Sequence, residues 1–263
     1  MKKHPVIITA SHSCGDVPEN IKERLSLSDF EIWQMHDPFT AETCIYPQAY
    51  ATHKALNHRI LGDLNRDRDA KDIFRENDFY GRKIWQETRG LEKEEKEDIL
   101  KKFWDPYRNG IKKSFQELIN KGVKKILFID HHNTAIDHPA NNGQYLPPIN
   151  LGNYGDAHGN FIEKPLSASA EIICAFQSFL QKELSEITTE INKVYKGSAL
   201  LRFVQNEIQP EFPDCEIHAV HLEYNLNLIF NPLSKNIDNK ARNSLHNGIN
   251  QAISLLMKDY FLS

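Results

Sequence analysis

Histidines follow two β-rich runs of the sequence, where buried strands are expected to end. His12 follows residues 6–9, and the pair His131-His132 follows residues 125–129. Neutral imidazole is the commonest metal ligand near neutral pH, and a hydrolytic zinc site combines three protein ligands with a position for water. Two histidines and one carboxylate would make such a set. Because adjacent strand residues point to opposite faces, only one of His131 and His132 is expected to face the ion.

The carboxylate of this set has two candidates in the acidic segment 36–42, Asp37 and Glu42. Asp37 precedes a proline, and a turn residue is the alternative interpretation of that position. Asp16 and Glu19 follow His12 by four and seven residues, so neither gives the H-x-x-E spacing that places two ligands on one helical turn. The residues alone therefore leave the carboxylate open.

Two further positions could act on a substrate. Asn65 and Arg66 lie in the run Asp-Leu-Asn-Arg-Asp-Arg, where an amide donor and a planar guanidinium suit a carboxylate-bearing ligand. A solvated charged loop is the alternative. Glu223 ends the apolar run 217–223, where a carboxylate could accept a proton from an attacking water. A solvent-exposed glutamate on an edge strand is the alternative there.

A cysteine offers a different chemistry. Cys14 lies two residues from His12, which could activate its thiol, so a cysteine hydrolase is a second hypothesis. Two positions apart in a turn is poor geometry for a nucleophile and its base. A third hypothesis is a protein that binds a metal or an anion without catalysis.

The elements that must hold these residues alternate between strands and helices, which favours an α/β sandwich. Helices are expected over residues 91–122, 167–182 and 239–258, where apolar residues recur at helical spacing. Pro106 is expected to end or kink the first helix, and Gly122 to cap it. Residues 141–160 are rich in Gly, Asn and Pro and predict a long loop beside a site.

Composition narrows the function classes. The 263 residues carry a net charge of −4, and the pI of about 6.3 gives no electrostatic footprint for nucleic acid. No apolar run approaches the roughly 18 residues of a membrane span, and the first residues lack the apolar region of a signal peptide. The four cysteines form no C-x-x-C pair, so we expect a reducing, cytoplasmic setting.

The order of these pieces resembles the N-formylglutamate amidohydrolase family, distant relatives of the zinc carboxypeptidases. The turn at residues 11–15 is similar to the family's histidine-serine-glycine turn, and residues 63–66 match its D-L-N-R motif. Asp130-His131-His132 matches the D-x-H motif with His132 in the ligand position, and Glu223 matches the late glutamate. The segment 147–152 is similar to a family segment beside the site.

The resemblance implies a single catalytic domain over residues 1–263, with a three-layer α/β/α sandwich around a mixed sheet as in the zinc carboxypeptidases. It implies hydrolysis of the amide bond of a small N-acylated amino acid, such as N-formylglutamate, with one zinc ion. His12, Asp37 and His132 would bind the ion, with Glu42 as the alternative to Asp37. Asn65 and Arg66 would hold the substrate carboxylate. Glu223 would be the general base, and Asp130 would orient a metal histidine.

The sequence departs from the family pattern at three places. Asn133 stands where the family has a serine, and Tyr224 and Asn225 stand where it often has an arginine. The loop around residues 195–197 is short. These differences concern the substrate rather than the scaffold or the metal ligands, and the sequence does not fix the oligomeric state.

Overall fold

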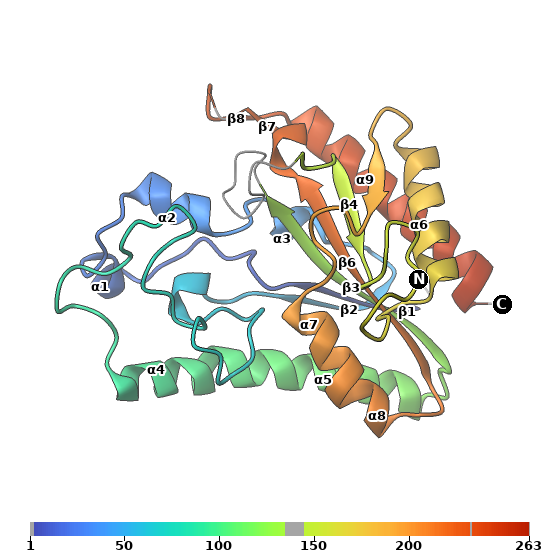
Figure 1. Ribbon diagram of the computed structural model, residues 1–263, viewed down its shortest axis with the longest axis horizontal. Coiled ribbons are helices and arrows are strands. Elements are labelled where there is room, and N and C mark those ends of the chain that lie inside the picture. Colours follow the sequence, from blue (N-terminus) through green and yellow to red (C-terminus); the bar gives the residue numbers. More distant parts are fainter. Residues whose placement is uncertain (1–2, 135–144, 232, 263) are drawn as a thin grey trace.

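Six strands form one mixed sheet at the centre of the protein (Figure 1). The computed structural model describes residues 3–134, 145–231 and 233–262. The strand order is β2-β1-β3-β6-β4-β5, and β4 runs antiparallel to its neighbour β6 while the other pairs are parallel. The strands are β1 (His4–Ala10), β2 (Ala49–Lys54), β3 (Lys125–Thr134), β4 (Ile149–Gly152), β5 (Thr189–Ile191) and β6 (Glu216–Asn225).

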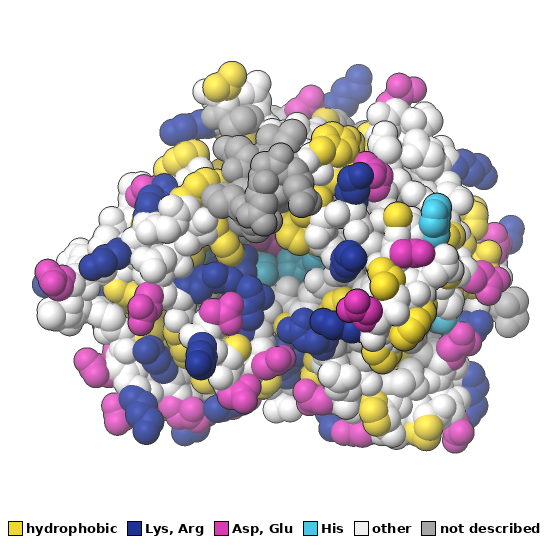
Figure 2. All heavy atoms as spheres, viewed as in Figure 1, with side chains coloured by type: hydrophobic (Ala, Val, Ile, Leu, Met, Phe, Trp, Pro, Cys, Tyr) yellow, Lys and Arg dark blue, Asp and Glu magenta, His cyan; other side chains and the backbone are white. Residues whose placement is uncertain are grey.

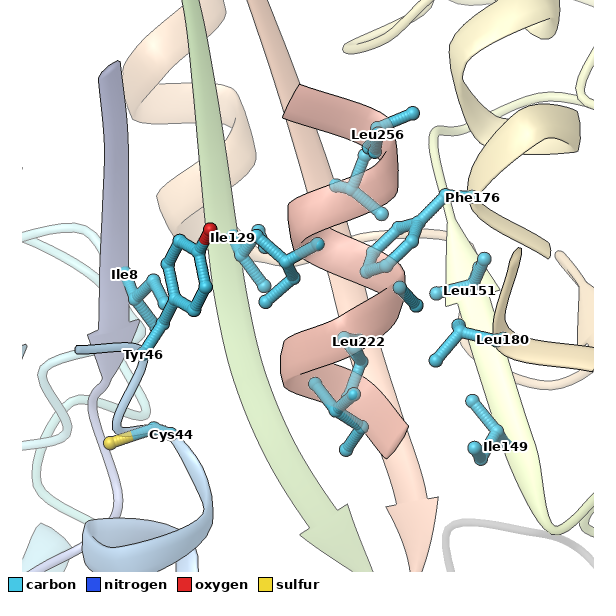
Figure 3. Close-up of a cluster of buried hydrophobic side chains, with 14 of the residues drawn as sticks. Ile8, Cys44, Tyr46, Ile129, Ile149, Leu151, Phe176, Leu180, Leu222 and Leu256 are labelled. Carbon is cyan, nitrogen blue, oxygen red and sulfur yellow. The ribbon is translucent and has the colours of Figure 1, made fainter. Parts of the chain in front are cut away.

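Helices cover both faces of this sheet, which confirms the predicted three-layer α/β/α architecture. Helices α6 (Ala170–Glu183) and α9 (Asn239–Leu256) pack on one face. There Ile129 and Leu222 meet Phe176 and Leu256 (Figure 3). The other face packs against α5 (Asp105–Asn120) and α7 (Ala199–Phe203). Side chains alternate along each strand, so residues such as Ile7 and Phe128, next to those of the first face, point to this second face.

The helix expected over residues 91–122 forms, but Pro106 does not end it. Helix α4 (Lys93–Ile99) continues through a π-helical turn, η2 (Leu100–Trp104), into α5. Pro106 lies in the first turn of α5, just after the hydrogen-bond register has changed, where its missing N–H is tolerated. Gly122 adopts φ +83° just after the helix, as a C-terminal cap requires.

The other predicted elements need one correction. Helices α6 and α9 form close to the expected bounds, and α9 continues as a π-helical turn, η6 (Met257–Phe261). The expected loop 141–160 is wrong in part, because β4 lies within it; residues 141–144 are outside the described residues. All four residues of β4 are buried, and its pairing with β6 and β5 supplies the backbone hydrogen bonds that local sequence did not suggest.

A smaller hydrophobic cluster stands beside the sheet, built by the connection between β1 and α4. It contains Ile21, Ile32, Ile60, Ile84 and Leu91. The short elements of this connection are α1 (Glu19–Lys22), α2 (Asp29–Met35), α3 (Thr40–Thr43) and η1 (Arg59–Leu61). In Figure 1 helices α1 and α2 of this connection lie to the left of the sheet, whereas its strand β2 belongs to the sheet.

The remaining short elements are η4 (Val204–Ile208), α8 (Gln209–Glu211), η5 (Leu226–Leu228), β7 (Phe230–Asn231) and β8 (Asn236–Ile237). Of the helices in the described ranges, none combines the length and apolar character needed to cross a bilayer.

Candidate active site

Four titratable side chains stand on one face of the two central strands, at their carboxyl ends. β3 and β6 run parallel in a register that pairs Asp130 with His221 and His132 with Glu223. Residues two apart on a strand share a face, so all four side chains project toward the side of α5 and α7. The parallel sheet therefore gathers chemistry from two distant segments at one edge.

Residues His12 and Asp37 complete a compact group with His132. The backbone N–H of Asp37 donates to the carbonyl of His12 over 2.9 Å, which brings the turn after β1 against the turn after α2. Asp37 Oδ2 lies 3.4 Å from His12 Nδ1 and 2.8 Å from His132 Nδ1. All three residues are buried, and their ligating atoms lie within 4.8 Å of one another.

The second ring nitrogen of each histidine faces a buried carboxylate. His12 Nε2 lies 2.7 Å from Asp63 Oδ1, and His132 Nε2 lies 3.0 Å from Asp130 Oδ2. Such partners fix the orientation of a metal-binding imidazole. Asp63 also pairs with Arg59 Nη2 at 2.5 Å.

The charges of this group are mutually stabilised. Burial alone would raise the pKa of Asp37, but the imidazoles of His12 and His132 hold it well below its ordinary value. Burial would likewise raise the pKa of Asp63, and the nearby Arg59 and His12 lower it far more. For His132 burial opposes the charge, while Asp130 and Asp37 raise its pKa well above the usual range. The carboxylates are therefore ionised at neutral pH.

The two alternative ligands lie elsewhere. His131 projects from the opposite face of β3, where its Nε2 lies 3.0 Å from Thr43 Oγ1 and its ring packs on Tyr224. Burial lowers the pKa of His131 to about 3. Glu42 is exposed on α3. The structure thus brings His132 and Asp37 into the group with His12, and neither alternative residue.

A second group of potential ligands shares His132 with the first. It consists of Asp130, His132 and His221, all buried. His12, Asp37 and His132 all line a cavity, whereas Asp130 does not. Asp130 is instead held by the neighbouring strand β1, because Thr9 Oγ1 donates a hydrogen bond to its Oδ1 over 2.8 Å. Among the described residues, only the group with His12 presents all its members to a substrate.

Glu223 lines the same cavity next to His132. It is 5% exposed, and its Oε2 lies 2.9 Å from Nε2 of His221. The ring of His221 stacks on that of His132 with centroids 5.0 Å apart. Glu223 is therefore held beside the group of ligands, rather than standing in solvent at the edge of the sheet.

Residues Asn65 and Arg66 also line the cavity, and both already have protein contacts. Asn65 Nδ2 lies 3.4 Å from His132 Nε2, and Asn65 Oδ1 accepts a hydrogen bond from the backbone N–H of Leu200 at the start of α7. Arg66 Nε donates to Asp72 over 2.7 Å. Arg59 and Arg202 line the cavity as well.

The cavity has a volume of about 320 Å³, within the usual size for small-molecule sites. Figure 2 shows histidine side chains at the bottom of a hollow, with arginine and lysine side chains on either side. Strand β4 supports one wall: Asn150, paired with Glu223, donates through Nδ2 to the carbonyl of Tyr195, which lines the cavity.

Two of the departures from the family pattern support the turn that carries Asp37. The side-chain amide of Asn133 donates to the carbonyl of Pro38 and to the hydroxyl of Tyr224. Tyr224 is fully buried on the far face of β6. These two residues therefore fix the residue after Asp37 from behind.

Cys14 lies apart from this chemistry. It does not line the cavity, and it packs against the cluster under α5. Burial raises the pKa of its thiol, which disfavours the thiolate that a nucleophile needs. The geometry gives no support to a cysteine hydrolase.

Sequence reasoning did not assign three of the residues found here. Asp63 stood inside the D-L-N-R motif but received no role, although its place beside Asn65 was a usable signal. His221 shares a strand face with Glu223 at i, i+2 spacing, which was also visible. Arg59 gave no signal, because its burial and its pairing with Asp63 depend on tertiary packing.

The turn that carries Arg59 and Asp63 is held by a neutral histidine. His58 Nδ1 accepts the backbone N–H of Ile60 over 3.1 Å, so its Nε2 carries the proton and donates to the carbonyl of Ile32. Burial, together with nearby His36, lowers the pKa of His58 to about 3.

We expect His58 to make the protein sensitive to mild acid. Its pKa is lower in the folded state than the unfolded value of about 6.5. Its stabilising contribution is therefore complete above pH 6.5 and is lost as the pH falls toward 3, by up to about 1.4 kcal/mol per pH unit. The free energy of unfolding, measured with urea at pH 6, 5 and 4, should decline less steeply with falling pH for His58→Asn than for the wild type. Equal slopes would contradict this.

Comparison with known proteins identifies a family and a shared fold. A model of the N-formylglutamate amidohydrolase family matches residues 4–230. The structure is similar to that of N-formylglutamate amidohydrolase from Ralstonia eutropha JMP134, with a TM-score of 0.73 and 12% identity over 98% of this chain and 96% of that chain. It is also similar to a gene product of Agrobacterium tumefaciens, with a TM-score of 0.69 and 14% identity over 97% and 92% of the two chains. At these identities the two structures show a shared fold. No curated protein sequence matches the chain significantly.

Proposed function

Because the chain belongs to the N-formylglutamate amidohydrolase family and is thus a hydrolase of carbon–nitrogen amide bonds, we propose that it cleaves a small N-acylated amino acid, such as N-formylglutamate, with one zinc ion. One observation carries the proposal. His12 and His132 both turn Nδ1 toward Asp37, and each turns Nε2 toward a second buried aspartate, Asp63 for His12 and Asp130 for His132.

The donor set suits zinc. Two nitrogens and one carboxylate oxygen make up one of the recurring ligand sets of catalytic zinc sites. Ligand atoms about 2 Å from a tetrahedral ion are about 3.3 Å apart, and the distances from Asp37 Oδ2 to the two imidazoles are 3.4 and 2.8 Å. We propose that His12, Asp37 and His132 hold the ion, which the adjoining cavity leaves accessible to water and substrate.

The proposed chemistry divides between the ion and the protein. Zinc, when bound, lowers the pKa of a water and polarises the amide carbonyl. Glu223 accepts a proton from the attacking water and delivers it to the nitrogen of the leaving amine. His221 keeps the Glu223 carboxylate oriented through the 2.9 Å contact. Asp63 and Asp130 keep the imidazoles of His12 and His132 in place.

The function can be tested with purified protein. Zinc content should be close to one ion per chain, and zinc-loaded enzyme should release formate from N-formylglutamate. Removal of the ion with a chelator should abolish hydrolysis, and added zinc should restore it. Full activity in metal-free protein would contradict the metal assignment. A lack of hydrolysis of any N-acyl amino acid by zinc-loaded enzyme would contradict the function.

We propose that Arg66 binds the substrate carboxylate, together with Arg59. Arg66→Lys should raise KM by roughly 10-fold while zinc content stays unchanged, because a point charge cannot replace the two-bond fork.

The matched control for this variant is Arg68→Lys. Arg68 belongs to the same charged run but pairs with Glu97 and Asp105 and does not line the cavity. It should leave KM unchanged. If Arg66→Lys kept the wild-type preference for carboxylate-bearing over neutral amides, its assignment would be wrong.

A further inference from the structure

One side of the cavity is apolar. Phe30 and Trp33 of α2 stack with ring centroids 5.7 Å apart, and Trp33 packs on Phe230 of β7 at 4.9 Å. Leu226 joins them, and all four side chains line the cavity. We call Phe30, Trp33, Leu226 and Phe230 the aromatic wall.

The aromatic wall is joined to the candidate catalytic residues through the chain itself. Trp33 precedes Asp37 by four residues, at the end of the helix that leads into the ligand turn. Leu226 follows Glu223 by three residues, directly after β6. An apolar surface is thereby held next to both the proposed ligand and the proposed base.

The cationic side chains of the cavity come from other elements. Arg59 and Arg66 belong to η1 and the turn after it, and Arg202 to α7. Figure 2 shows dark blue side chains on both sides of the histidines in the hollow and yellow ones at its rim. Because the arginines and the aromatic wall line one cavity from different elements, a substrate with its carboxylate on the arginines can extend its acyl group to the aromatic wall.

A formyl group has no carbon beyond the carbonyl and could not cover this surface. A cavity of about 320 Å³ also leaves space beyond N-formylglutamate. Apolar surface of the wall that remains hydrated in the complex contributes nothing to binding. Apolar surface that is covered by an apolar acyl chain favours binding.

We propose that the preferred substrate of this site is an N-acyl amino acid whose acyl group is apolar and larger than formyl, such as an arylacyl group. The inference rests on the proposed amide hydrolysis and specifies its substrate class. The acyl chain lies against the aromatic wall, the carboxylate lies on the arginines, and the scissile carbonyl lies at the group of His12, Asp37 and His132.

The test compares N-acetylglutamate with N-phenylacetylglutamate, because their carbonyl groups have similar reactivity. Zinc-loaded wild-type enzyme should show a kcat/KM at least about 10-fold higher for the phenylacetyl compound, the scale of apolar discrimination in enzyme pockets. Trp33→Ala should remove most of this ratio, because it should lower kcat/KM far more for the phenylacetyl compound than for the acetyl compound. Phe30→Ala, at a residue 39% exposed, provides a second variant with less effect on folding.

The control is Phe161→Ala, since Phe161 is 64% exposed and does not line the cavity. It should keep the wild-type ratio. Cleavage of N-formylglutamate or N-acetylglutamate without a preference for the larger acyl group would overturn this inference and leave the proposed function standing. An equal loss on both substrates in Trp33→Ala and Phe30→Ala would also overturn it. Failure to cleave any N-acyl amino acid would overturn the proposed function, and this inference with it.

Discussion

Replacement of His132 by alanine is expected to remove both the zinc ion and the activity. The variant leaves two ligands, His12 and Asp37, which cannot complete a three-ligand shell. Activity should fall by more than the roughly 10- to 100-fold that loss of a partner behind a ligand costs. Metal analysis of the purified variant and its rate with N-formylglutamate or a larger N-acylglutamate check both parts.

His131→Ala is the matched control, because it removes the neighbouring histidine from the opposite face of the same strand. That side chain contacts Thr43 and Tyr224, so its loss should lower the free energy of unfolding by roughly 1–3 kcal/mol and leave zinc bound. A His132→Ala protein with a full zinc content, beside a His131→Ala protein without zinc, would show that the wrong histidine was chosen.

The meeting of His12 and His132 could be predicted from the sequence, since the carboxyl ends of parallel strands meet at one edge. The choice between His131 and His132 could not be derived from periodicity. β3 runs on through both residues to Thr134, and alternation alone does not say which face carries the site. The family resemblance supplied that choice, and the pairing of His132 with Glu223 now gives it a geometric reason.

The support of the site could not be read from local sequence. Asp63 is fully buried and Arg59 is 7% exposed, although Asp63 begins a run whose composition also fits a solvated charged loop and Arg59 precedes that run by four residues. Their burial arises because the connection between β1 and α4 folds as a unit with its own apolar cluster. Strand β4 was also missed, because its four residues form a strand only through their pairing with β6.

Burial of so many charges would be costly unless each were paired. Asp37, Asp63 and Asp130 are all buried, and each lies within 3.0 Å of an imidazole or a guanidinium. Removing a single partner would leave an uncompensated charge, which is far more destabilising than the pair itself is stabilising. Conservative replacements of similar shape are therefore the informative ones for this site.

Glu223→Gln is such a replacement, and it is expected to reduce turnover by roughly 100-fold or more while fold and zinc are kept. Glutamine matches glutamate in size and can still accept a hydrogen bond from His221 Nε2, which holds the residue in place. Its amide cannot accept a proton from water or return one to the leaving nitrogen. The turnover number and the zinc content should be measured on the same preparation.

Strand β6 provides a matched control for this variant at its other end. Glu216 pairs with His218 at 2.7 Å, the same i, i+2 arrangement as Glu223 with His221, but its side chain is 53% exposed and lies away from the cavity. Glu216→Gln should leave turnover nearly unchanged. If Glu223 were only another such pair, both variants would behave alike. If Glu223 were a metal ligand, zinc would be lost together with activity. Loss of turnover with zinc retained, in Glu223→Gln alone, is the result that a proton-transfer role requires.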